Sequence, residues 1–438
     1  MRISTDQLSE ELKKGLTELA GFMDFVIDPA GLRLRAVQNE GDDTVQITYD
    51  ADGCIVTYQK KVQFYKAFAH ILRGEEQAVT MRPAFSDLQI MVDCSRNAVL
   101  NVDGAKKLIG YLAILGFEAL QLYTEDTLEI PDYPYAGYMR GRYSQEEIVA
   151  IREYGDIFGV ELIPCIQTLA HLGQALRWGE HEEMWDIDNI LLIDEEKTYV
   201  FLESLIKQCR AMFGSERINI GMDEAYQVGM GKYLRTHGYT DRSALMVKHL
   251  NRVVDICHKY GFKPMMWSDM FFYLQFKGDY YVAEGSFSEE VKRAIPEDLT
   301  LIYWDYYTCD PARYDKMFDM HHDLHGRTGF AGGAWRWMGA VPNNGYSLRA
   351  VEVALTEAVK AKIPQVIATL WGDDGGEAAV FTVMPTLQLY SDINYYGDRD
   401  RLEENFKITT GMNFDEFMLI DGPQAMPGYD YAKPWINP

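Results

Sequence analysis

RINIGMDEAY, residues 217–226, is the stretch from which the fold can be read. Its apolar run Ile218–Met222 follows a charged residue and stops at two adjacent carboxylates, Asp223 and Glu224, a pattern typical of a buried parallel strand. Side chains alternate along a strand, so neighbouring carboxylates can share one site only where the chain leaves the regular pleat. We therefore place both at the C-terminal end of the strand, where α/β proteins build active sites. The alternative is a solvated pair that opens a loop.

The same order of strand, loop and helix repeats on both sides of this stretch. Eight apolar runs predict strands: Leu88–Val92, Ala119–Tyr123, Glu161–Ile166, Ile218–Met222, Lys263–Trp267, Thr300–Trp304, Gly329–Ala334 and Val366–Trp371. Helical periodicity falls between them over Asp103–Leu115, Gln145–Phe158, Thr198–Phe213, Arg242–Lys259, Arg313–His322 and Leu348–Lys362. This α/β rhythm over about 300 residues predicts a (β/α)8 TIM barrel. An open doubly wound sheet is the alternative, but no GxGxxG follows the first strand.

The ends of the chain differ from this repeat. Residues 1–82 combine a helical segment at 9–23, three alternating segments (LRLRAVQ, TVQITYD and CIVTYQKKV) and a second helix over Gln63–Leu72. We expect a small α+β domain there, without a catalytic cluster. The catalytic barrel should span residues 83–390, and a tail of irregular structure or short helices, residues 391–438, should pack on it.

Composition limits the partners and the location. The chain has 42 basic and 66 acidic residues and a formal charge of -24, so we expect neither nucleic acid nor an anionic membrane as partner. The six cysteines are scattered without a CxxC, which favours a reducing compartment. We find no signal-like apolar segment at the start and no run approaching about 18 apolar residues. These features predict a cytoplasmic protein.

Chemically active residues follow the predicted strands, and a barrel would bring them to one face. The polar ones are Asp93, Arg96, Glu125, Asp126, Gln167, His171, Asp223, Glu224, Asp269, Asp373 and Glu377. The aromatic ones are Trp267, Trp304, Tyr306, Trp335, Trp337 and Trp371. Aromatic platforms beside carboxylates suit a hydroxyl-rich ring with apolar faces, which predicts a sugar ligand. The alternative for any one tryptophan is that it caps the barrel core.

Other site chemistries lack their motifs. No glycine-rich loop with Lys-Ser/Thr and no GxSxG is present, which disfavours phosphate ligands and Ser-His-Asp chemistry. His321, His322 and His325 fall within a helix rather than at a strand end, so we predict a surface cluster there and not a metal site. We expect no metal and no cofactor.

Carboxylate chemistry on a glycoside remains. Most glycosidases hold two carboxyl groups on opposite sides of the scissile bond, which adjacent residues on one loop do not obviously do. The pair suits a different division of labour, in which one acid protonates the leaving group while the 2-acetamido oxygen of the substrate attacks. The other carboxylate would hold the acetamido N–H and stabilise the oxazolinium charge.

The sequence at this point resembles glycoside hydrolase family 20, the β-N-acetylhexosaminidases. The family pattern H-x-G-x-D-E ends the fourth barrel strand, and residues 219–224 here read NIGMDE, with Asn219 in place of His. The resemblance implies that Glu224 is the general acid/base and that Asp223 orients the acetamido group. It covers residues 83–390, and LYTEDTLEIPDYPYAGYMRG and WGDDGGE look closest to signal-less bacterial members.

The resemblance also implies roles for the other strand-end residues. Arg96 would bind ring hydroxyls of the terminal sugar, and His171 would be the active-site histidine of the family. Tyr306 is our choice for the tyrosine on the acetamido carbonyl, because the usual position after strand seven carries tryptophan. The remaining predicted substrate contacts are Asp126, Trp267, Trp304, Trp337, Trp371, Asp373 and Glu377.

We therefore expect an exo-β-N-acetylhexosaminidase that acts on a glycan or glycoconjugate with terminal β-linked GlcNAc or GalNAc, without metal or cofactor; we also consider a homodimer. One alternative is a non-catalytic carbohydrate-binding barrel. The other is a barrel glycosidase for non-acetamido sugars, which would pair Glu224 with Glu125 or Asp269.

Overall fold

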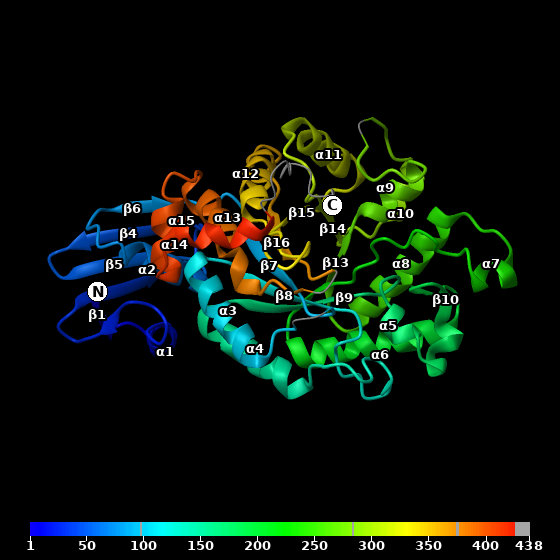
Figure 1. The fold of residues 1–438 in the computed structure, drawn as a ribbon, viewed down its shortest axis with the longest axis horizontal. Helices are drawn as coiled ribbons and strands as arrows, with labels where there is room; N and C mark the ends of the chain where they lie inside the picture. The colour runs from blue at the N-terminus through cyan, green and yellow to red at the C-terminus, as the bar shows by residue number, and fades with distance from the viewer. Residues whose placement is uncertain (97–98, 283, 374–375, 425–438) are drawn as a thin grey trace.

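The computed structural model describes residues 1–96, 99–282, 284–373 and 376–424, and its centre is a closed barrel of eight parallel strands (Figure 1). Their order around the barrel is β12-β13-β14-β15-β16-β7-β8-β9. The strands are β7 (Asp87–Asp93), β8 (Ala119–Thr124), β9 (Glu161–Ile166), β12 (Arg217–Asn219), β13 (Lys263–Trp267), β14 (Thr300–Trp304), β15 (Thr328–Gly333) and β16 (Gln365–Leu370). The predicted TIM barrel is confirmed.

Helices surround the barrel, and of the long ones only α13 is not among the predicted helical segments. The long ones are α3 (Val102–Leu115), α4 (Gln145–Phe158), α6 (Glu196–Phe213), α8 (Arg242–Lys259), α11 (Pro311–Leu324), α12 (Asn344–Lys360) and α13 (Met384–Tyr396). Shorter elements on the loops are α5 (Gly173–Leu176), η1 (Gly179–Met184), β10 (Trp185–Ile187), β11 (Ile190–Leu191), α7 (Lys232–His237), α9 (Asp269–Gln275), α10 (Glu289–Ala294) and η2 (Val380–Val383). Ser144 caps α4 through a capping box with Glu147, which explains why the predicted start is correct.

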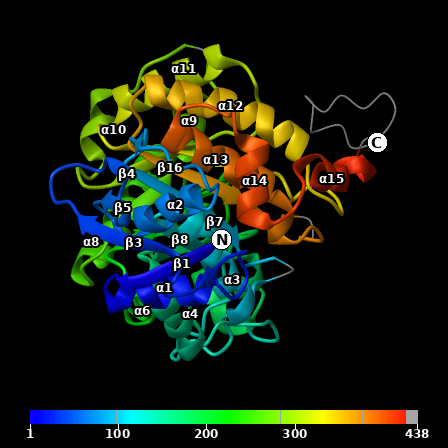
Figure 2. The ribbon, with the colours of Figure 1, turned by 90° about the vertical axis from the view of Figure 1, so that its left-hand side faces the viewer.

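The N-terminal region forms a separate mixed sheet of order β2-β1-β3-β5-β4-β6 (Figure 2). Its elements are β1 (Arg2–Gln7), α1 (Glu10–Leu19), β2 (Val26–Ile27), β3 (Leu32–Gln38), β4 (Val45–Asp50), β5 (Gly53–Tyr58), α2 (Lys61–Ile71) and β6 (Val79–Met81). Strand β1 is not among the predicted elements, because its apolar and polar residues do not alternate cleanly. Helix α2 is buried along nearly its whole length, because it packs between this sheet and the barrel helices.

The C-terminal helices connect the N-terminal sheet to the barrel. Helix α13 runs across residue 390, the expected boundary between barrel and tail, and α14 (Leu402–Thr410), α15 (Phe414–Met418) and η3 (Leu419–Gln424) follow it. The end of the expected tail, residues 425–438, lies outside the described residues. Lys66 of α2 donates to Ser391 Oγ of α13 at 2.7 Å and lies 3.9 Å from Asp392 Oδ1. This buried contact fixes the N-terminal domain to the barrel.

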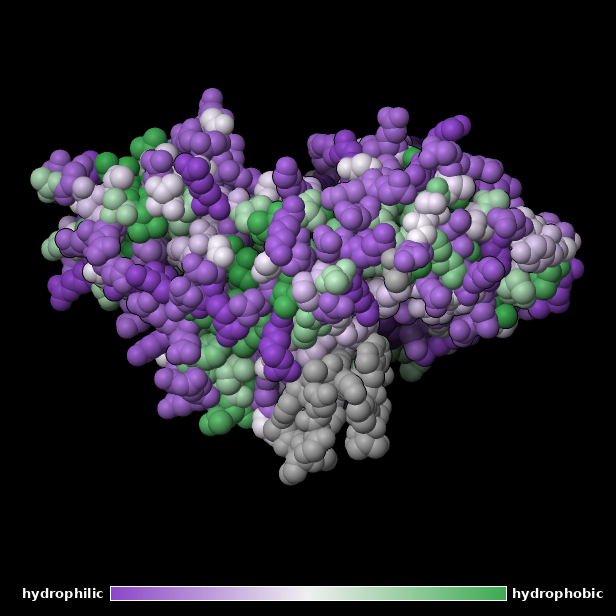
Figure 3. Space-filling view, turned by 90° about the horizontal axis from the view of Figure 1, so that it is seen from above, coloured by the Kyte–Doolittle hydropathy of each residue, from purple (hydrophilic) through white to green (hydrophobic). Residues whose placement is uncertain are grey.

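The surface agrees with the acidic composition. One face consists mostly of hydrophilic residues, with hydrophobic patches of limited extent (Figure 3). Within the part of the chain that the structure describes, we find no helix with both the length and the apolar character to cross a membrane.

Candidate active site

The site begins where β12 ends. Gly221, Met222 and Glu224 have φ angles of +69°, +72° and +54°, in the left-handed region. A Cβ on Gly221 would lie 2.3 Å from Gln167 Oε1 and 2.6 Å from the Ile166 carbonyl oxygen, so only glycine fits there. The strand consequently stops at Asn219, three residues before the predicted end at Met222. This departure from the pleat lets Asp223 and Glu224 face one site.

Two side chains, one from β12 itself and one from the end of the neighbouring strand β9, hold this turn through its backbone. Asn219 Oδ1 accepts the Gly221 N–H at 3.0 Å, and Gln167 Oε1 accepts the Met222 N–H at 3.2 Å. Asn219, at the position of the family histidine, therefore stabilises the turn from within the barrel. Gln167 Nε2 also donates to Asp223 Oδ1 at 2.7 Å, so one side chain fixes both the backbone and a carboxylate.

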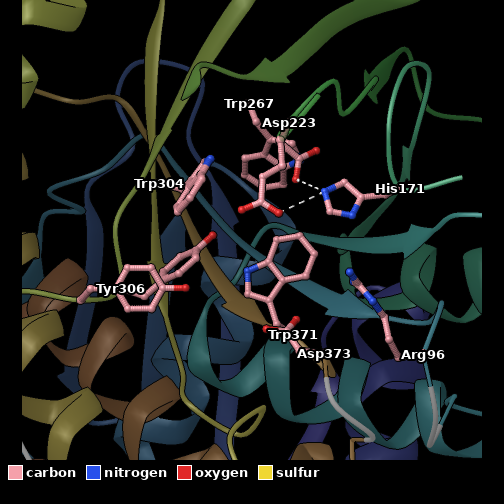
Figure 4. Close-up of a pocket in the computed structure, with 10 residues that line it drawn as sticks. Arg96, His171, Asp223, Trp267, Trp304, Tyr306, Trp371 and Asp373 are labelled. Carbon is pink, nitrogen blue, oxygen red and sulfur yellow. Dashed lines mark ion pairs between the residues drawn. The ribbon is translucent and has the colours of Figure 1, made fainter. Parts of the chain in front are cut away.

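His171 connects the two carboxylates. Its Nε2 lies 3.3 Å from Asp223 Oδ2 and 3.4 Å from Glu224 Oε2 (Figure 4). Burial alone would lower the pKa of His171, but the two carboxylates outweigh it and raise that pKa well above its ordinary value. Burial likewise opposes ionisation of Asp223, yet His171 and Gln167 hold the pKa of Asp223 below its ordinary value. The arrangement keeps Asp223 ionised.

A third carboxylate, Asp269 at the start of α9, fixes the backbone of Glu224 and the indole ring of Trp304 by hydrogen bonds. Its Oδ2 accepts the Glu224 N–H at 2.9 Å, and its Oδ1 accepts the Trp304 indole N–H at 3.3 Å. Burial and the Asp223 charge raise the pKa of Asp269, while the Glu224 N–H opposes the rise. Both carboxylate oxygens of Asp269 thus accept hydrogen bonds from the protein, and Asp269 does not line the cavity described next.

A cavity of about 420 Å³ opens over these carboxylates, at the C-terminal ends of the barrel strands. In Figure 4, Trp267, Trp304 and Trp371 surround the space, and His171 and Arg96 approach it from the side opposite Trp304 and Tyr306. Its lining contains nine of the predicted site residues and one more: Arg96, His171, Asp223, Glu224, Trp267, Trp304, Tyr306, Tyr307, Trp371 and Asp373.

Arg96 is held in a fixed position at this cavity. Its guanidinium lies 2.9 Å from Asp93 Oδ2 and 3.3 Å from Glu125 Oε1, and above the rings of Tyr123 and Trp371. Burial raises the pKa of Glu125 to about 7, against the opposing effect of Arg96. The guanidinium is therefore oriented before any ligand arrives.

Three predicted substrate contacts lie outside the cavity lining. Asp126 is buried and paired with Arg140 at 3.0 Å. Trp337 is buried and stacks on Trp335 with ring centroids 4.2 Å apart. It also makes an edge contact with the ring of Tyr306, so it packs against that ring and does not reach the cavity. Glu377 is exposed, away from the lining. Counting residues from a strand end identified the right loops for these three, but the side chains point elsewhere.

Tyr307 lines the cavity without having been predicted, although it follows Tyr306 directly after β14. The predicted surface cluster of histidines is wrong for His321, which is buried: its Nε2 lies 2.7 Å from Ser268 Oγ, and its ring packs on Tyr303 and Phe272. The apolar stripe of α11 carries His321 into the core.

Several solved structures share this fold. An exo β-N-acetylglucosaminidase from Vibrio harveyi, in complex with N-acetylglucosamine, superposes with a TM-score of 0.66 at 15% identity and covers 99% of this chain and 75% of its own. A Streptomyces plicatus N-acetyl-β-hexosaminidase in complex with Thio-NAglucal gives a TM-score of 0.66 at 17% identity, covering 94% and 91%. These similarities concern the fold.

Two curated relatives are Hexosaminidase D of Homo sapiens and of Bos taurus. The human protein is 25% identical over 242 residues, which is 50% of this chain and 46% of that protein. The bovine protein is 24% identical over 268 residues, 54% of this chain and 68% of that protein. The match to the human relative therefore spans about half of its length.

A family model decides the assignment. The catalytic-domain model of glycosyl hydrolase family 20 matches residues 89–308, half of the chain, from β7 to the loop after β14. The matched segment contains the turn with Asp223 and Glu224. This chain belongs to glycosyl hydrolase family 20.

Proposed function

We propose that this protein is an exo-acting β-N-acetylhexosaminidase that removes terminal non-reducing β-linked GlcNAc or GalNAc by retaining, substrate-assisted catalysis. One observation carries the proposal: Asp223 and Glu224 lie on one turn and approach the same imidazole nitrogen. They are therefore not placed on opposite sides of a scissile bond, which two-carboxylate mechanisms need. A nucleophile supplied by the substrate fits this geometry.

Glu224 acts first as the general acid. It gives its proton to the glycosidic oxygen while the acetamido carbonyl oxygen forms a bond to C1 and the C1–O bond of the leaving group breaks. Water then attacks C1 of the oxazolinium from the face that the leaving group vacated, the bond between C1 and the acetamido oxygen breaks, and Glu224 takes up the proton of that water. Two inversions at C1 retain the β configuration.

Asp223 stabilises the charge that develops on the acetamido group. It is buried and ionised, so it can accept the acetamido N–H and oppose the positive charge of the oxazolinium. Tyr306 is the proposed donor to the acetamido carbonyl, since it lines the cavity with its ring stacked on Trp304 at 5.5 Å.

The other lining residues bind the sugar ring. Arg96 and Asp373 would contact ring hydroxyls, and Trp267, Trp304 and Trp371 would pack against the ring and the acetamido methyl. The names of the similar proteins, hexosaminidases and an N-acetylglucosaminidase, support a substrate of this class. A homodimer and a cytoplasmic location stay predictions, which solution molar mass and cell fractionation would check.

The proposal is tested with aryl β-GlcNAc, β-GalNAc and β-glucoside substrates, each with and without a thiazoline that mimics the oxazolinium. Cleavage confined to the acetamido sugars and blocked by the thiazoline would support both the substrate class and the mechanism. Cleavage of the glucoside would favour a non-acetamido glycosidase, and sugar binding without hydrolysis would favour a carbohydrate-binding barrel.

A further inference from the structure

The Glu224 carboxyl has a partner on the side away from His171. Tyr226, two residues further along the same turn, donates its hydroxyl to Glu224 Oε1 at 3.1 Å, while His171 lies beside Oε2. The backbone of Tyr226 is itself fixed, because its N–H donates to the Glu224 carbonyl at 2.7 Å and Arg242 donates to its carbonyl oxygen. Both oxygens of the acid therefore have a neighbour that restricts their rotation.

The hydroxyl of Tyr226 stays a donor at any pH near neutrality. Partial burial, followed by the charges of Glu224, Asp269 and Asp223, raises the pKa of Tyr226. The hydroxyl donates to Glu224 and does not line the cavity, so Glu224 and not Tyr226 is placed to protonate a leaving group. The hydroxyl can only orient Glu224 and stabilise its carboxylate after the acid has given up its own proton.

Tyr226 and the acid that its hydroxyl contacts are both partly exposed to solvent. The Glu224 side chain is 40% exposed against 10% for Asp223, so the acid faces the mouth of the cavity and Asp223 its floor. Tyr226 is 41% exposed, and its ring packs on Tyr273 of α9 with centroids 4.5 Å apart and planes tilted by 41°. Neither ring lines the cavity that would take the terminal sugar.

We propose that Tyr226 and Tyr273 form the leaving-group side of this active site. Tyr226 is a positioning residue for Glu224, and the paired rings provide the surface against which the departing sugar lies. The leaving group must sit where Glu224 can reach the glycosidic oxygen, and Glu224 contacts this pair through the Tyr226 hydroxyl at Oε1. Aromatic rings favour the apolar face of a sugar over a charged group. This inference rests on the proposed function.

Tyr226→Phe tests the positioning role, because it removes the hydroxyl and keeps the ring. The substrates are chitobiose, whose leaving sugar needs a proton, and 2,4-dinitrophenyl β-GlcNAc, whose phenolate leaves without one. We expect kcat/KM for chitobiose to fall by about 10- to 100-fold, the effect of one hydrogen bond to a charged group, and that for the aryl glycoside to change by less than about 3-fold.

The matched control is Tyr260→Phe. Tyr260 also donates its hydroxyl to a glutamate, Glu203, at 2.8 Å, but it lies between α8 and the start of β13, at the other end of the barrel. This variant should cleave both substrates at the wild-type rate. An equal loss on both substrates in Tyr226→Phe would reduce Tyr226 to a structural residue, and no loss on chitobiose would overturn its positioning role.

Tyr273→Ala tests the surface for the departing sugar. In a Glu224→Gln background, which should bind without cleaving, we expect calorimetry to show about 3- to 10-fold weaker binding of chitobiose and less than a ~2-fold change for GlcNAc. Weakening of both ligands, or of neither, would contradict this surface. If the wild-type protein neither binds nor cleaves any acetamido sugar, the proposed function fails and not the assignment of these two tyrosines alone.

Discussion

Two clusters in this molecule each place a basic side chain beside carboxylates but differ in their surroundings: His171 with Asp223 and Glu224, and Lys66 with Asp392. At the barrel mouth, carboxylates raise the pKa of His171 and keep it charged. Between α2 and α13, burial lowers the pKa of Lys66 to about 8 and raises that of Asp392. All three charged groups of the first cluster line a cavity of about 420 Å³, whereas in the second only Lys66 borders a pocket, of about 200 Å³, and the cluster packs among the aromatic side chains of α13. A shifted pKa therefore indicates chemistry only where a ligand can reach the group.

The largest effect should follow from Glu224→Gln at the cavity. We expect kcat/KM for aryl β-GlcNAc to fall by about 10²- to 10⁴-fold, because the proton for the leaving group is lost. Thermal unfolding should stay close to the wild-type transition, since the Glu224 side chain is partly solvated. Near-wild-type turnover would remove Glu224 from the role of acid.

Asp223→Asn should have the next largest effect on turnover. We expect kcat to fall by about 10²- to 10³-fold with a smaller change in KM, because the carboxylate acts mainly on charge that develops after binding. Steady-state kinetics separate the two constants. A loss confined to KM would mean that Asp223 only binds the substrate.

Changes in the Lys66–Asp392 cluster should alter the stability of the protein and not its activity. Asp392→Leu leaves Lys66 buried without its carboxylate and should lower the free energy of unfolding by about 3–5 kcal/mol. The double variant Lys66→Met/Asp392→Leu should be neutral or more stable by up to about 4 kcal/mol. Chemical denaturation measures both, and kcat of the folded fraction should be unchanged. A loss of kcat would contradict the separation of the two clusters.

Asp269→Asn should affect the cavity less than a change in the acid itself. An amide can accept only one of the two N–H groups that Asp269 now accepts, so either the Glu224 turn or Trp304 loses its support. We expect kcat/KM to fall by about 10- to 100-fold. Asp392→Asn, a buried carboxylate away from the cavity, is the control and should leave kcat/KM unchanged.

The pH dependence of stability should have opposite signs at the two clusters. The pKa of His171 is raised by folding, so its contribution is complete below the unfolded value of about 6.5 and is lost as pH rises through the folded value. The pKa of Lys66 is lowered from about 10.4 in the unfolded chain, so its burial costs less as pH rises above about 8. Unfolding of Lys66→Met and His171→Gln between about pH 6 and 10 should diverge from wild type in opposite directions; parallel curves would contradict one of the two shifts.

The same contrast separates what the sequence predicts from what it does not. Continuous apolar runs that alternate with amphipathic helical segments predict the barrel, since each strand is buried on both faces and each helix carries one apolar stripe. They also identify the loops that carry Arg96 and His171. Periodicity does not predict the left-handed turn after Asn219, because that turn depends on Gln167 from another strand.

Side-chain direction is the second limit. Trp337 and Tyr306 both follow strands closely, yet Trp337 packs behind the ring of Tyr306 and only Tyr306 reaches the cavity. Tyr226 ends the stretch RINIGMDEAY itself, but its contact with Glu224 requires the turn geometry that periodicity cannot supply. The Lys66–Asp392 contact joins residues far apart in the chain, and no local pattern indicates it.

In the proposed mechanism, the acetamido oxygen of the substrate is the nucleophile. The most direct test measures kcat/KM for 4-methylumbelliferyl glycosides of glucosamine whose N-acyl group carries no, one, two or three fluorine atoms. Fluorine withdraws electron density from the carbonyl oxygen, so a nucleophilic role predicts a stepwise and steep decline along the series. Equal rates across the series would show that the carbonyl oxygen does not attack C1, and would contradict the proposed roles of Asp223 and Glu224.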